Sequence, residues 1–340
     1  MIPIRTDVKS PICWVGGKAA LKDEIIASLP LECDRYVEVF GGGATIMLAK
    51  PRDKFEVYND FNSDLVNMFR CIKEMPLSFF KTAGYLPLNS RQEFADLQKF
   101  LQKQHFDSSY IEQETKVAKE ILTEEEANQI CTILQGRTEL YDVERAVAFY
   151  KVIRYSYGSS GKSFGSQPVN LENALLGIYA VSDRLKNVVI ENKDFESLIK
   201  QYDRKNTAFY ADPPYYMSES FYQVGFGLED HLRLSDSLHH IEGKFLLSYN
   251  DCDFIKDLYK DCCIVELSRP HSLAQRYSAG KVFKELLISN FDINERRKSE
   301  PTQLTLFGDE IYARNLLQEY RQKRTNNYTV MYENCLRDKR

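Results

Sequence analysis

The chain has 340 residues, of which 43% are hydrophobic and 28% charged, with a formal net charge of −4 at pH 7. This length can bury a substantial core in one large domain or two, and the mild acidity means that a nucleic-acid partner would have to meet a local basic surface. No apolar run approaches the roughly 20 residues of a membrane helix, and the beginning of the chain lacks a signal-peptide pattern, so we expect a cytoplasmic protein without a membrane partner.

The first motif is the segment Cys13-Trp14-Val15-Gly16-Gly17-Lys18, which precedes a helix that Pro30 ends. A Gly-Gly turn at the start of a helix can hold an anionic group, because free N–H groups and the helix dipole both point there. Lys18 would add a positive charge. An ordinary helix start explains the same residues, so the segment alone decides nothing.

A second glycine motif lies between predicted strands at 36–40 and 55–58, where Gly41-Gly42-Gly43 leads into a helix over 44–49. Strand, glycine turn and helix begin a nucleotide-binding βαβ unit, and Asp60 has the spacing at which an acid reaches ribose hydroxyls. A dinucleotide-binding dehydrogenase needs a third glycine where this chain has Ile46. The pattern therefore favours a cofactor made of adenosine with a small zwitterionic tail.

The middle of the chain differs in character. Residues 75–142 are polar and charged with helical periodicity, which predicts a mainly helical insertion outside the sheet. A buried helix follows, and after it residues 156–168 form a loop of small hydrogen-bond donors. Because Arg154, Tyr157 and Lys162 lie in or beside this loop, we expect it to contact phosphates or to insert into a duplex; a plain surface linker is the alternative.

Strands and helices then alternate again. Strands are expected over 187–190, 207–211, 244–250, 262–267 and 282–289. Asp194-Phe195 follows the first of them, and a basic loop with Arg269, Arg276 and Lys281 separates the last two. The alternation predicts an α/β fold with a twisted, mostly parallel sheet and an antiparallel pair near its end.

The sequence Asp212-Pro213-Pro214-Tyr215 follows a short, buried strand rich in aromatic residues. Proline cannot donate to a strand ladder and has a fixed φ, so two prolines end the strand abruptly. A carboxylate, a rigid carbonyl and an aromatic ring are thereby placed at the C-terminal end of a strand, where open α/β sheets carry their chemistry.

Five motifs in this order resemble those of the Dam-like adenine-N6 DNA methyltransferases, also called the D12 class, with the α arrangement of motifs. They are Trp14-Val15-Gly16-Gly17-Lys18, Glu38-Val39-Phe40-Gly41-Gly42-Gly43, Asn59-Asp60, Asp194-Phe195 and Asp212-Pro213-Pro214-Tyr215. The resemblance implies a Rossmann-like sheet that binds S-adenosylmethionine, with a mainly helical target-recognition insertion. The implied reaction is site-specific methyl transfer from S-adenosylmethionine to N6 of a flipped adenine in double-stranded DNA.

The resemblance also implies roles for single residues. Cofactor contacts or pocket walls are expected from Trp14, Gly17, Lys18, Glu38, Phe40, Gly41, Gly43, Asp60, Asp194, Phe195 and Asp212. Asp212, Pro213, Pro214 and Tyr215 are the expected catalytic residues. Between the two outer glycines the family usually has another small residue; here it is Gly42, which we expect only to loosen the turn.

The chemistry expected at Asp212 follows from the weak nucleophilicity of an adenine amino group, whose lone pair is delocalised into the ring. Asp212 and the Pro213 carbonyl would accept its two N–H bonds and point the lone pair at the methyl group. Tyr215 would stack on the base after it leaves the duplex. No metal is expected, since eight scattered cysteines and five histidines show no metal-ligand spacing.

Three regions are expected: a catalytic domain from 1–74 and 187–290, a target-recognition insertion over 75–186, and a linker and tail over 291–340. Arg154, Tyr157, Lys162, Arg269, Arg276 and Lys281 are the expected DNA-binding residues. In the tail, Gln303-Leu304-Thr305-Leu306-Phe307 resembles the peptide with which bacterial proteins bind the sliding clamp, although a packed terminal segment is the alternative. A cognate restriction endonuclease is a further possible partner.

Two other functions remain open from the sequence. One is methylation of N4 of cytosine or of another amino group by an enzyme of the same fold. The motif order argues against this alternative, and so does Asp212, because the methyltransferases that act on protein glutamine have Asn at that position. The other is a catalytically inactive DNA-binding or clamp-tethered regulator, against which the intact motif set argues.

Overall fold

In this computed structural model the described residues are 8–84, 90–102, 119–120, 122–129, 142–165, 171–217, 225–270 and 282–294. They belong to one compact unit, Met1–Arg296, and Arg297–Arg340 is a second unit outside the described residues. The predicted clamp peptide at 303–307 therefore lies outside the described part, as do Arg276, Lys281 and the side chain of Arg269. No helix in the described ranges is long and apolar enough to cross a membrane.

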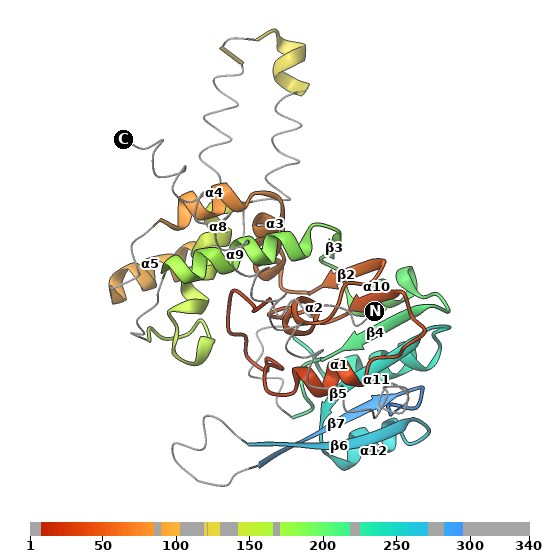
Figure 1. Ribbon diagram of the computed structural model, residues 1–340. Coiled ribbons are helices and arrows are strands. Elements are labelled where there is room, and N and C mark those ends of the chain that lie inside the picture. Colours follow the sequence, from red (N-terminus) through yellow and green to blue (C-terminus); the bar gives the residue numbers. More distant parts are fainter. Residues whose placement is uncertain are drawn as a thin grey trace, which may run out of the picture. The chain divides into compact units, whose positions relative to one another are not determined.

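A seven-stranded sheet forms the centre of the first unit (Figure 1). Its strands are β1 (Arg35–Glu38), β2 (Phe55–Asn59), β3 (Val188–Glu191), β4 (Thr207–Ala211), β5 (Lys244–Asn250), β6 (Cys263–Pro270) and β7 (Val282–Ser289). The spatial order is β3-β2-β1-β4-β5-β7-β6. The first five strands run parallel, and β7 is antiparallel to both of its neighbours. The predicted Rossmann-like sheet, mostly parallel with antiparallel pairing at one end, is confirmed.

Helices cover both faces of this sheet, and each face has its own apolar core. One layer contains α1 (Lys22–Ala27), α2 (Thr45–Ala49), α3 (Ser63–Glu74) and α9 (Leu171–Leu185); the other contains α10 (Phe195–Tyr202), α11 (Leu228–His239) and α12 (Asp253–Leu258). Successive side chains of a strand point to opposite faces, so Tyr36 packs in the first core and Val37 in the second. The continuous apolar strands of the sequence are explained by this double burial.

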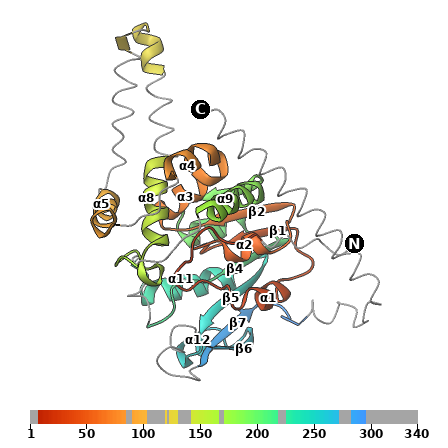
Figure 2. The same cartoon turned by 60° about the vertical axis from the view of Figure 1, so that its left-hand side comes forward.

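Three more helices form a group beside the sheet. They are α4 (Pro76–Ala83), α5 (Arg91–Gln102) and α8 (Val143–Arg154), grouped at one side of the sheet in Figure 2. Within this group α8 packs against α3, and the other two helices pack against α8. Asn67 of α3 exchanges two hydrogen bonds with the backbone of Asp142, of 2.8 and 2.9 Å, and Asp142 in turn caps α8 by accepting from the Arg145 N–H. The expectation that 75–186 is a target-recognition region stays a prediction; these helices belong to the same compact unit as the sheet.

The strand order reverses between β1 and β4, which are hydrogen-bonded neighbours. From β1 the chain continues outward to β2, whereas from β4 it continues in the opposite direction to β5. The connections that leave their C-terminal ends therefore diverge and leave a crevice between them, where open α/β sheets bind their ligands. The glycine turn after β1 and Asp212 after β4 both lie at this position.

Candidate active site

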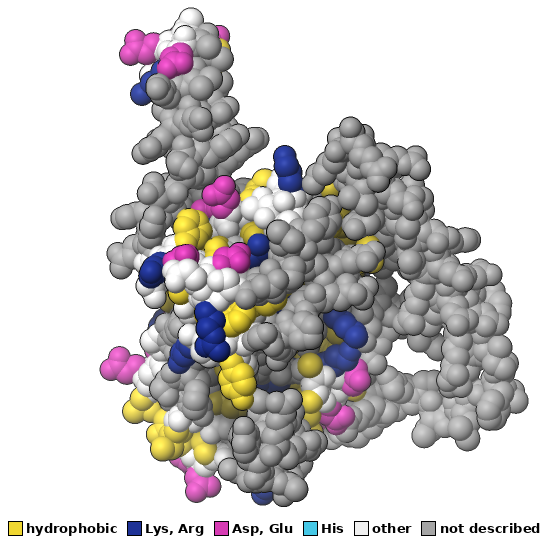
Figure 3. Space-filling view, turned by 90° about the vertical axis from the view of Figure 1, so that its left-hand side faces the viewer, with side chains coloured by type: hydrophobic (Ala, Val, Ile, Leu, Met, Phe, Trp, Pro, Cys, Tyr) yellow, Lys and Arg dark blue, Asp and Glu magenta, His cyan; other side chains and the backbone are white. Residues whose placement is uncertain are grey.

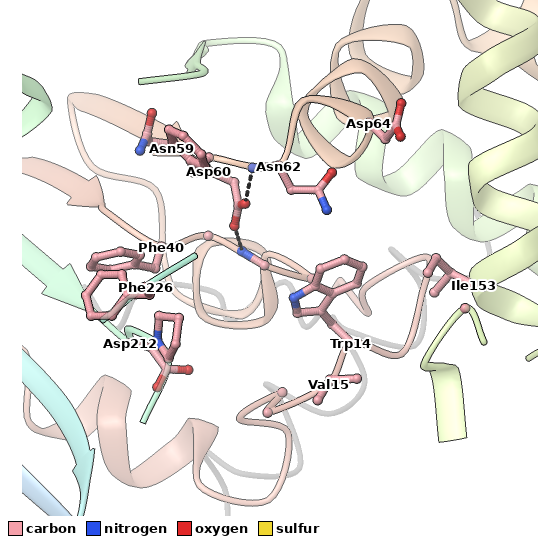
Figure 4. Close-up of a pocket in the computed structure, with 18 of the residues that line it drawn as sticks. Trp14, Val15, Phe40, Asn59, Asp60, Asn62, Asp64, Ile153, Asp212 and Phe226 are labelled. Atoms are coloured by element: carbon pink, nitrogen blue, oxygen red, sulfur yellow. Dashed lines mark hydrogen bonds between the residues drawn. The ribbon is translucent and has the colours of Figure 1, made fainter. Parts of the chain in front are cut away.

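A cavity of about 900 Å³ opens at the C-terminal ends of β1 and β4. Every expected cofactor residue lines it: Trp14, Gly17, Lys18, Glu38, Phe40, Gly41, Gly43, Asp60, Asp194, Phe195 and Asp212. Pro214 lines it too, while Pro213 and Tyr215 are not among its lining residues. Figure 4 shows Phe40, Phe226 and Asp212 on one side of the cavity and the Trp14 ring across from them. The structure thus brings together motifs that are up to about 200 residues apart in the chain.

The glycine turn is packed closely against two aromatic side chains. A Cβ atom on Gly41 would lie 2.1 Å from the Tyr58 ring, and one on Gly42 would lie 2.8 Å from Cδ1 of Trp14. Gly42 also has a φ of +48°, a conformation that costs other residues about 1 kcal/mol or more. The expectation that Gly42 only loosens the turn is wrong: it lets the Trp14 indole approach the backbone.

Asp60 fixes this turn from the end of β2. Its Oδ2 accepts from the Gly42 N–H at 2.9 Å and its Oδ1 from the Asn62 N–H at 2.8 Å (Figure 4). Burial raises the pKa of Asp60, and these backbone hydrogen bonds oppose the rise. Each carboxylate oxygen accepts only one of these bonds and has a further lone pair, so the group has acceptor capacity left for hydroxyl groups in the cavity.

Glu38 is the second carboxyl group at the cavity, at the end of β1, and is only 2% exposed. Burial raises its pKa to about 8. This shift is opposed by the Tyr36 hydroxyl, which donates to Oε2 at 3.0 Å, and by the Lys50 ammonium group. The Asp212 charge adds to the shift. At neutral pH Glu38 is therefore mostly protonated. A cation placed beside it would favour its ionised form.

An aromatic wall closes one side of the cavity. Phe40, Phe195 and Phe226 have ring centroids 5.7 to 5.8 Å apart. Arg233 lies over the Phe195 ring at 4.8 Å and donates to Asp194 at 3.0 Å. Sequence analysis assigned no specific role to Phe226 or Arg233. The available signal was an aromatic residue between two glycines, just before a helix.

Lys18 and Asp212 form an ion pair within the cavity wall. The Lys18 Nζ is 2.7 Å from Oδ2 and 2.6 Å from Oδ1 of Asp212, donates to the Gly16 carbonyl at 3.1 Å, and lies 4.8 Å from the centroid of the Tyr215 ring. Lys18 is 4% exposed. One ammonium group therefore contacts both oxygens of the expected catalytic carboxylate and the neighbouring aromatic ring.

Residues outside the motifs hold the Asp212–Tyr216 segment in place. The Tyr215 hydroxyl donates to Oε2 of Glu285, a residue of β7 that is 2% exposed, at 3.1 Å. Asn250 donates to the Tyr216 carbonyl at 3.2 Å. Sequence reasoning missed Glu285; a single acidic residue within the apolar strand at 282–289 was the signal that could have indicated it.

The loop over 156–165 lies beside the cavity, with Ser159, Ser160, Gly161 and Lys162 among the lining residues. Gln98 of α5 donates to the Gly161 carbonyl at 2.6 Å, and the Gly165 N–H bonds the Tyr155 carbonyl at 2.7 Å. Lys162 is exposed, as is Tyr157 at 56%. Arg154 differs, because it is half-buried and donates to the Pro11 carbonyl at 3.0 Å.

Figure 3 shows the face that carries α5, α8 and this loop. Its described Lys and Arg side chains lie at separate places among hydrophobic and acidic side chains. This face therefore offers individual cations to a polyanion, in keeping with the near-neutral composition.

Comparisons with known proteins agree with this geometry. The sequence model of the family described as D12 class N6 adenine-specific DNA methyltransferase matches residues 14–274. The Type II methyltransferase M1.LlaDCHI of Lactococcus lactis subsp. cremoris is 27% identical over 293 residues, which cover 82% of this chain and 94% of that protein. The Type II methyltransferase M.CviBI of Paramecium bursaria Chlorella virus NC1A is 23% identical and covers 82% and 96%, and a DNA adenine methylase of Haemophilus influenzae is 22% identical and covers 81% and 91%.

Proposed function

Because the chain belongs to the D12 class of N6 adenine-specific DNA methyltransferases, whose methyl donor is S-adenosylmethionine, we propose that Asp212, Pro213, Pro214 and Tyr215 hold the target adenine for methylation. The family match confirms the predicted enzyme class and cofactor and favours adenine over the N4-cytosine alternative. The observation that carries the proposal is the position of Asp212, which lines the same cavity as the glycine turn and Asp60.

The residues of the cavity fit S-adenosylmethionine. Its volume of about 900 Å³ is within the range of small-molecule sites. Asp60 has lone pairs to spare for ribose hydroxyls, and the Phe40–Phe195–Phe226 wall offers apolar surface for the adenine ring of the cofactor. Glu38 is a buried carboxyl group whose ionisation a cationic cofactor favours. Bound there, the cofactor supplies an electrophilic methyl group on a positively charged sulfur.

The target base competes with Lys18. The Lys18 ammonium contacts both Asp212 oxygens and lies 4.8 Å from the Tyr215 ring centroid, and these are the two groups that should receive the amino group and the ring of the adenine. We therefore expect the arriving amino group to replace the Lys18 N–H donors on Asp212. The exchange keeps the half-buried carboxylate hydrogen-bonded, which limits its free-energy cost.

Asp212 then has two tasks. Its carboxylate accepts one N–H of the amino group while the Pro213 carbonyl accepts the other, which turns the nitrogen lone pair out of the ring and toward the methyl group. As the nitrogen gains the methyl group it loses one proton, and an oxygen of Asp212 is the acceptor already bonded to it. The proline dihedrals hold both acceptors in place beforehand, so little reorganisation is needed during transfer.

The Asp212→Ala variant tests this assignment. We expect transfer of labelled methyl groups from S-adenosylmethionine to DNA to fall at least about a hundredfold, because both the amino-group acceptor and the proton acceptor are lost. Asp236→Asn, which alters an exposed carboxylate on α11, is the matched control and should keep its activity. An Asp212→Ala enzyme that methylates DNA like the wild type would refute the proposal, provided that nucleoside analysis finds the product on adenine.

The remaining proposals concern partners. Double-stranded DNA is the substrate, and we assign its contacts to Tyr157, Lys162 and the basic loop with Arg269, Arg276 and Lys281; Arg154 would support the loop through Pro11 as well as face phosphates. Helices and loops within 75–186 would select the target sequence, which makes transfer site-specific. Binding of the sliding clamp through 303–307 and pairing with a restriction endonuclease stay predictions, the first open to a pull-down with Phe307→Ala.

A further inference from the structure

Three potential metal ligands meet at the edge of the sheet opposite the active site. His239 is the last residue of α11, and Asp261 and Cys262 lie in the turn that leads into β6. Nε2 of His239 is 3.2 Å from Oδ1 of Asp261 and 3.7 Å from Sγ of Cys262, and all three ligand atoms lie within 4.8 Å of one another. They border a surface hollow of about 330 Å³.

The hydrogen bonds of His239 leave an unusual contact to be explained. Its Nδ1 is 2.7 Å from the Ser235 carbonyl oxygen, which can only accept, so Nδ1 carries a proton. In a neutral ring Nε2 is then an acceptor, which the Cys262 thiol can reach at 3.7 Å, but the same nitrogen also lies 3.2 Å from a carboxylate oxygen of Asp261. Two acceptors at this distance repel one another unless a second ring proton or a cation lies between them.

The spacing of the ligands fits a cation. Zinc bonds of about 2.0–2.1 Å to nitrogen, about 2.0–2.2 Å to oxygen and about 2.3 Å to sulfur give tetrahedral edges of about 3.4 Å for N–O and about 3.6 Å for N–S. The corresponding observed distances are 3.2 and 3.7 Å. A histidine whose other ring nitrogen donates to a backbone carbonyl is also the usual arrangement of a metal ligand.

From this geometry we propose that His239, Asp261 and Cys262 bind one zinc-like divalent cation, with water completing the coordination. An imidazole, a thiolate and a carboxylate suit Zn²⁺ or Co²⁺ and not the oxygen-seeking Mg²⁺ or Ca²⁺. A cysteine binds such a cation as the thiolate, so binding releases the thiol proton.

The site is distant from the cavity that binds the methyl donor. β5 starts beside the hollow at Lys244 and ends at the active-site edge, so the whole length of the sheet separates the two. A cation here joins the end of α11 to the start of β6 and stabilises the fold without touching the reacting atoms. The methylation rate should not depend on it.

Two neighbouring residues serve as matched controls. Cys263 follows Cys262 and packs in the core on the opposite face of the sheet, as alternation along a strand requires. His240 follows His239 and makes the same Nδ1 contact, 2.7 Å to the Asp236 carbonyl, but it is 76% exposed and belongs to no such cluster. Each control keeps the residue type and sequence context of a ligand without its position.

The test is a titration of the chelator-treated full-length protein with Co²⁺ and then Zn²⁺. We expect one equivalent of Co²⁺ to give a thiolate charge-transfer band that Zn²⁺ removes and Mg²⁺ does not, together with a rise in the unfolding temperature. Cys262→Ser should abolish the band. His239→Ala should weaken metal binding by more than about tenfold, because loss of a residue that only supports a metal ligand already costs about tenfold. Cys263→Ser and His240→Ala should bind like the wild type.

If the wild-type protein binds no stoichiometric Co²⁺, or if the band survives in Cys262→Ser, the proposal is wrong, and a protonated His239 paired with Asp261 explains the contact instead. Cys13 is exposed and could bind metal by itself, so a Cys13→Ser background excludes that source of signal. Methylation activity of the Cys262→Ser protein should equal that of the wild type. If this variant lost methylation activity together with Co²⁺ binding, the proposal would also be refuted.

Discussion

At the scale of single residues, the active site depends on carboxyl groups in three different states. Asp212 is ion-paired with Lys18, Asp60 is bonded to two backbone N–H groups, and Glu38 is buried beside a tyrosine hydroxyl. Burial raises the pKa of Glu38 to about 8, because it outweighs the hydrogen bond and the nearby Lys50 charge.

The pKa of Glu38 predicts a pH dependence of stability. Its pKa is raised from 4.5 to about 8 on folding, so the folded state is favoured below pH 4.5 and loses this advantage as the pH rises to 8. Glu38→Gln removes the titration. In urea unfolding without cofactor, we expect the free energy of unfolding of the wild type to fall relative to that of the variant by a few kcal/mol as the pH rises from 5 to 8.5. An equal difference between the two proteins at both pH values would contradict the raised pKa.

Tyr215 allows a second prediction at this scale, since its ring and its hydroxyl have separate contacts. Tyr215→Ala removes the surface on which the base stacks, a loss of about 1–3 kcal/mol, so kcat/KM for DNA should fall about fivefold to a hundredfold. Tyr215→Phe keeps the ring and loses only the bond to Glu285, and it should retain most of the activity. Steady-state methylation assays compare them. If both variants lose activity equally, the bond to Glu285 and not the stacking surface is what matters.

At the scale of elements, the loop over 156–165 and the segment around Pro11 are physically connected. α8 ends at Arg154, whose guanidinium group bonds Pro11 just before Trp14, and the loop over 156–165 begins directly after this helix. Gln98 of α5 holds the same loop from its other side. Two hydrogen bonds therefore tie the end of α8 and the following loop to neighbouring parts of the chain.

The position of Lys162 in this loop predicts its contribution to DNA binding. It is exposed and lines the edge of the cavity, so Lys162→Ala should lower DNA affinity and reduce the slope of log K against log salt concentration by about one. Lys200→Ala, an exposed cation on α10 that does not line the cavity, is the control. Filter binding or anisotropy at several salt concentrations gives both slopes. A slope unchanged in Lys162→Ala would remove this residue from the DNA surface.

At the scale of the whole molecule, the sheet positions two groups of residues at opposite ends of its strands. The C-terminal ends of β1 and β4 border the cavity that we propose as the methyl-transfer site, and the cluster of His239, Asp261 and Cys262 lies at the opposite end. The net charge of −4 means that DNA binding has to rely on local cations, for which the basic loop beyond Arg269 is our proposal. Affinity for DNA should fall as salt is added, with a slope set by the number of phosphates that these cations neutralise.

The sequence by itself determined what depends on neighbouring residues. The apolar strands, the glycine turn after β1 and the proline-ended strand before Asp212 are local patterns, because side-chain alternation and backbone restrictions act over a few residues. In their order these patterns also sufficed to indicate the family and the cofactor. The start of the first helix was predicted less accurately, because it was expected directly after Lys18 and α1 begins at Lys22.

Only the tertiary structure decided which distant residues meet. Lys18 pairs with Asp212 across 194 positions, Tyr215 with Glu285 across 70, and His239 faces a thiol 23 residues away in a chain whose spacing predicted no metal site. Such contacts depend on the order and direction of strands in the sheet, which is a property of the whole chain. Local spacing therefore indicates the chemistry at Asp212, and strand topology determines the contacts that control it.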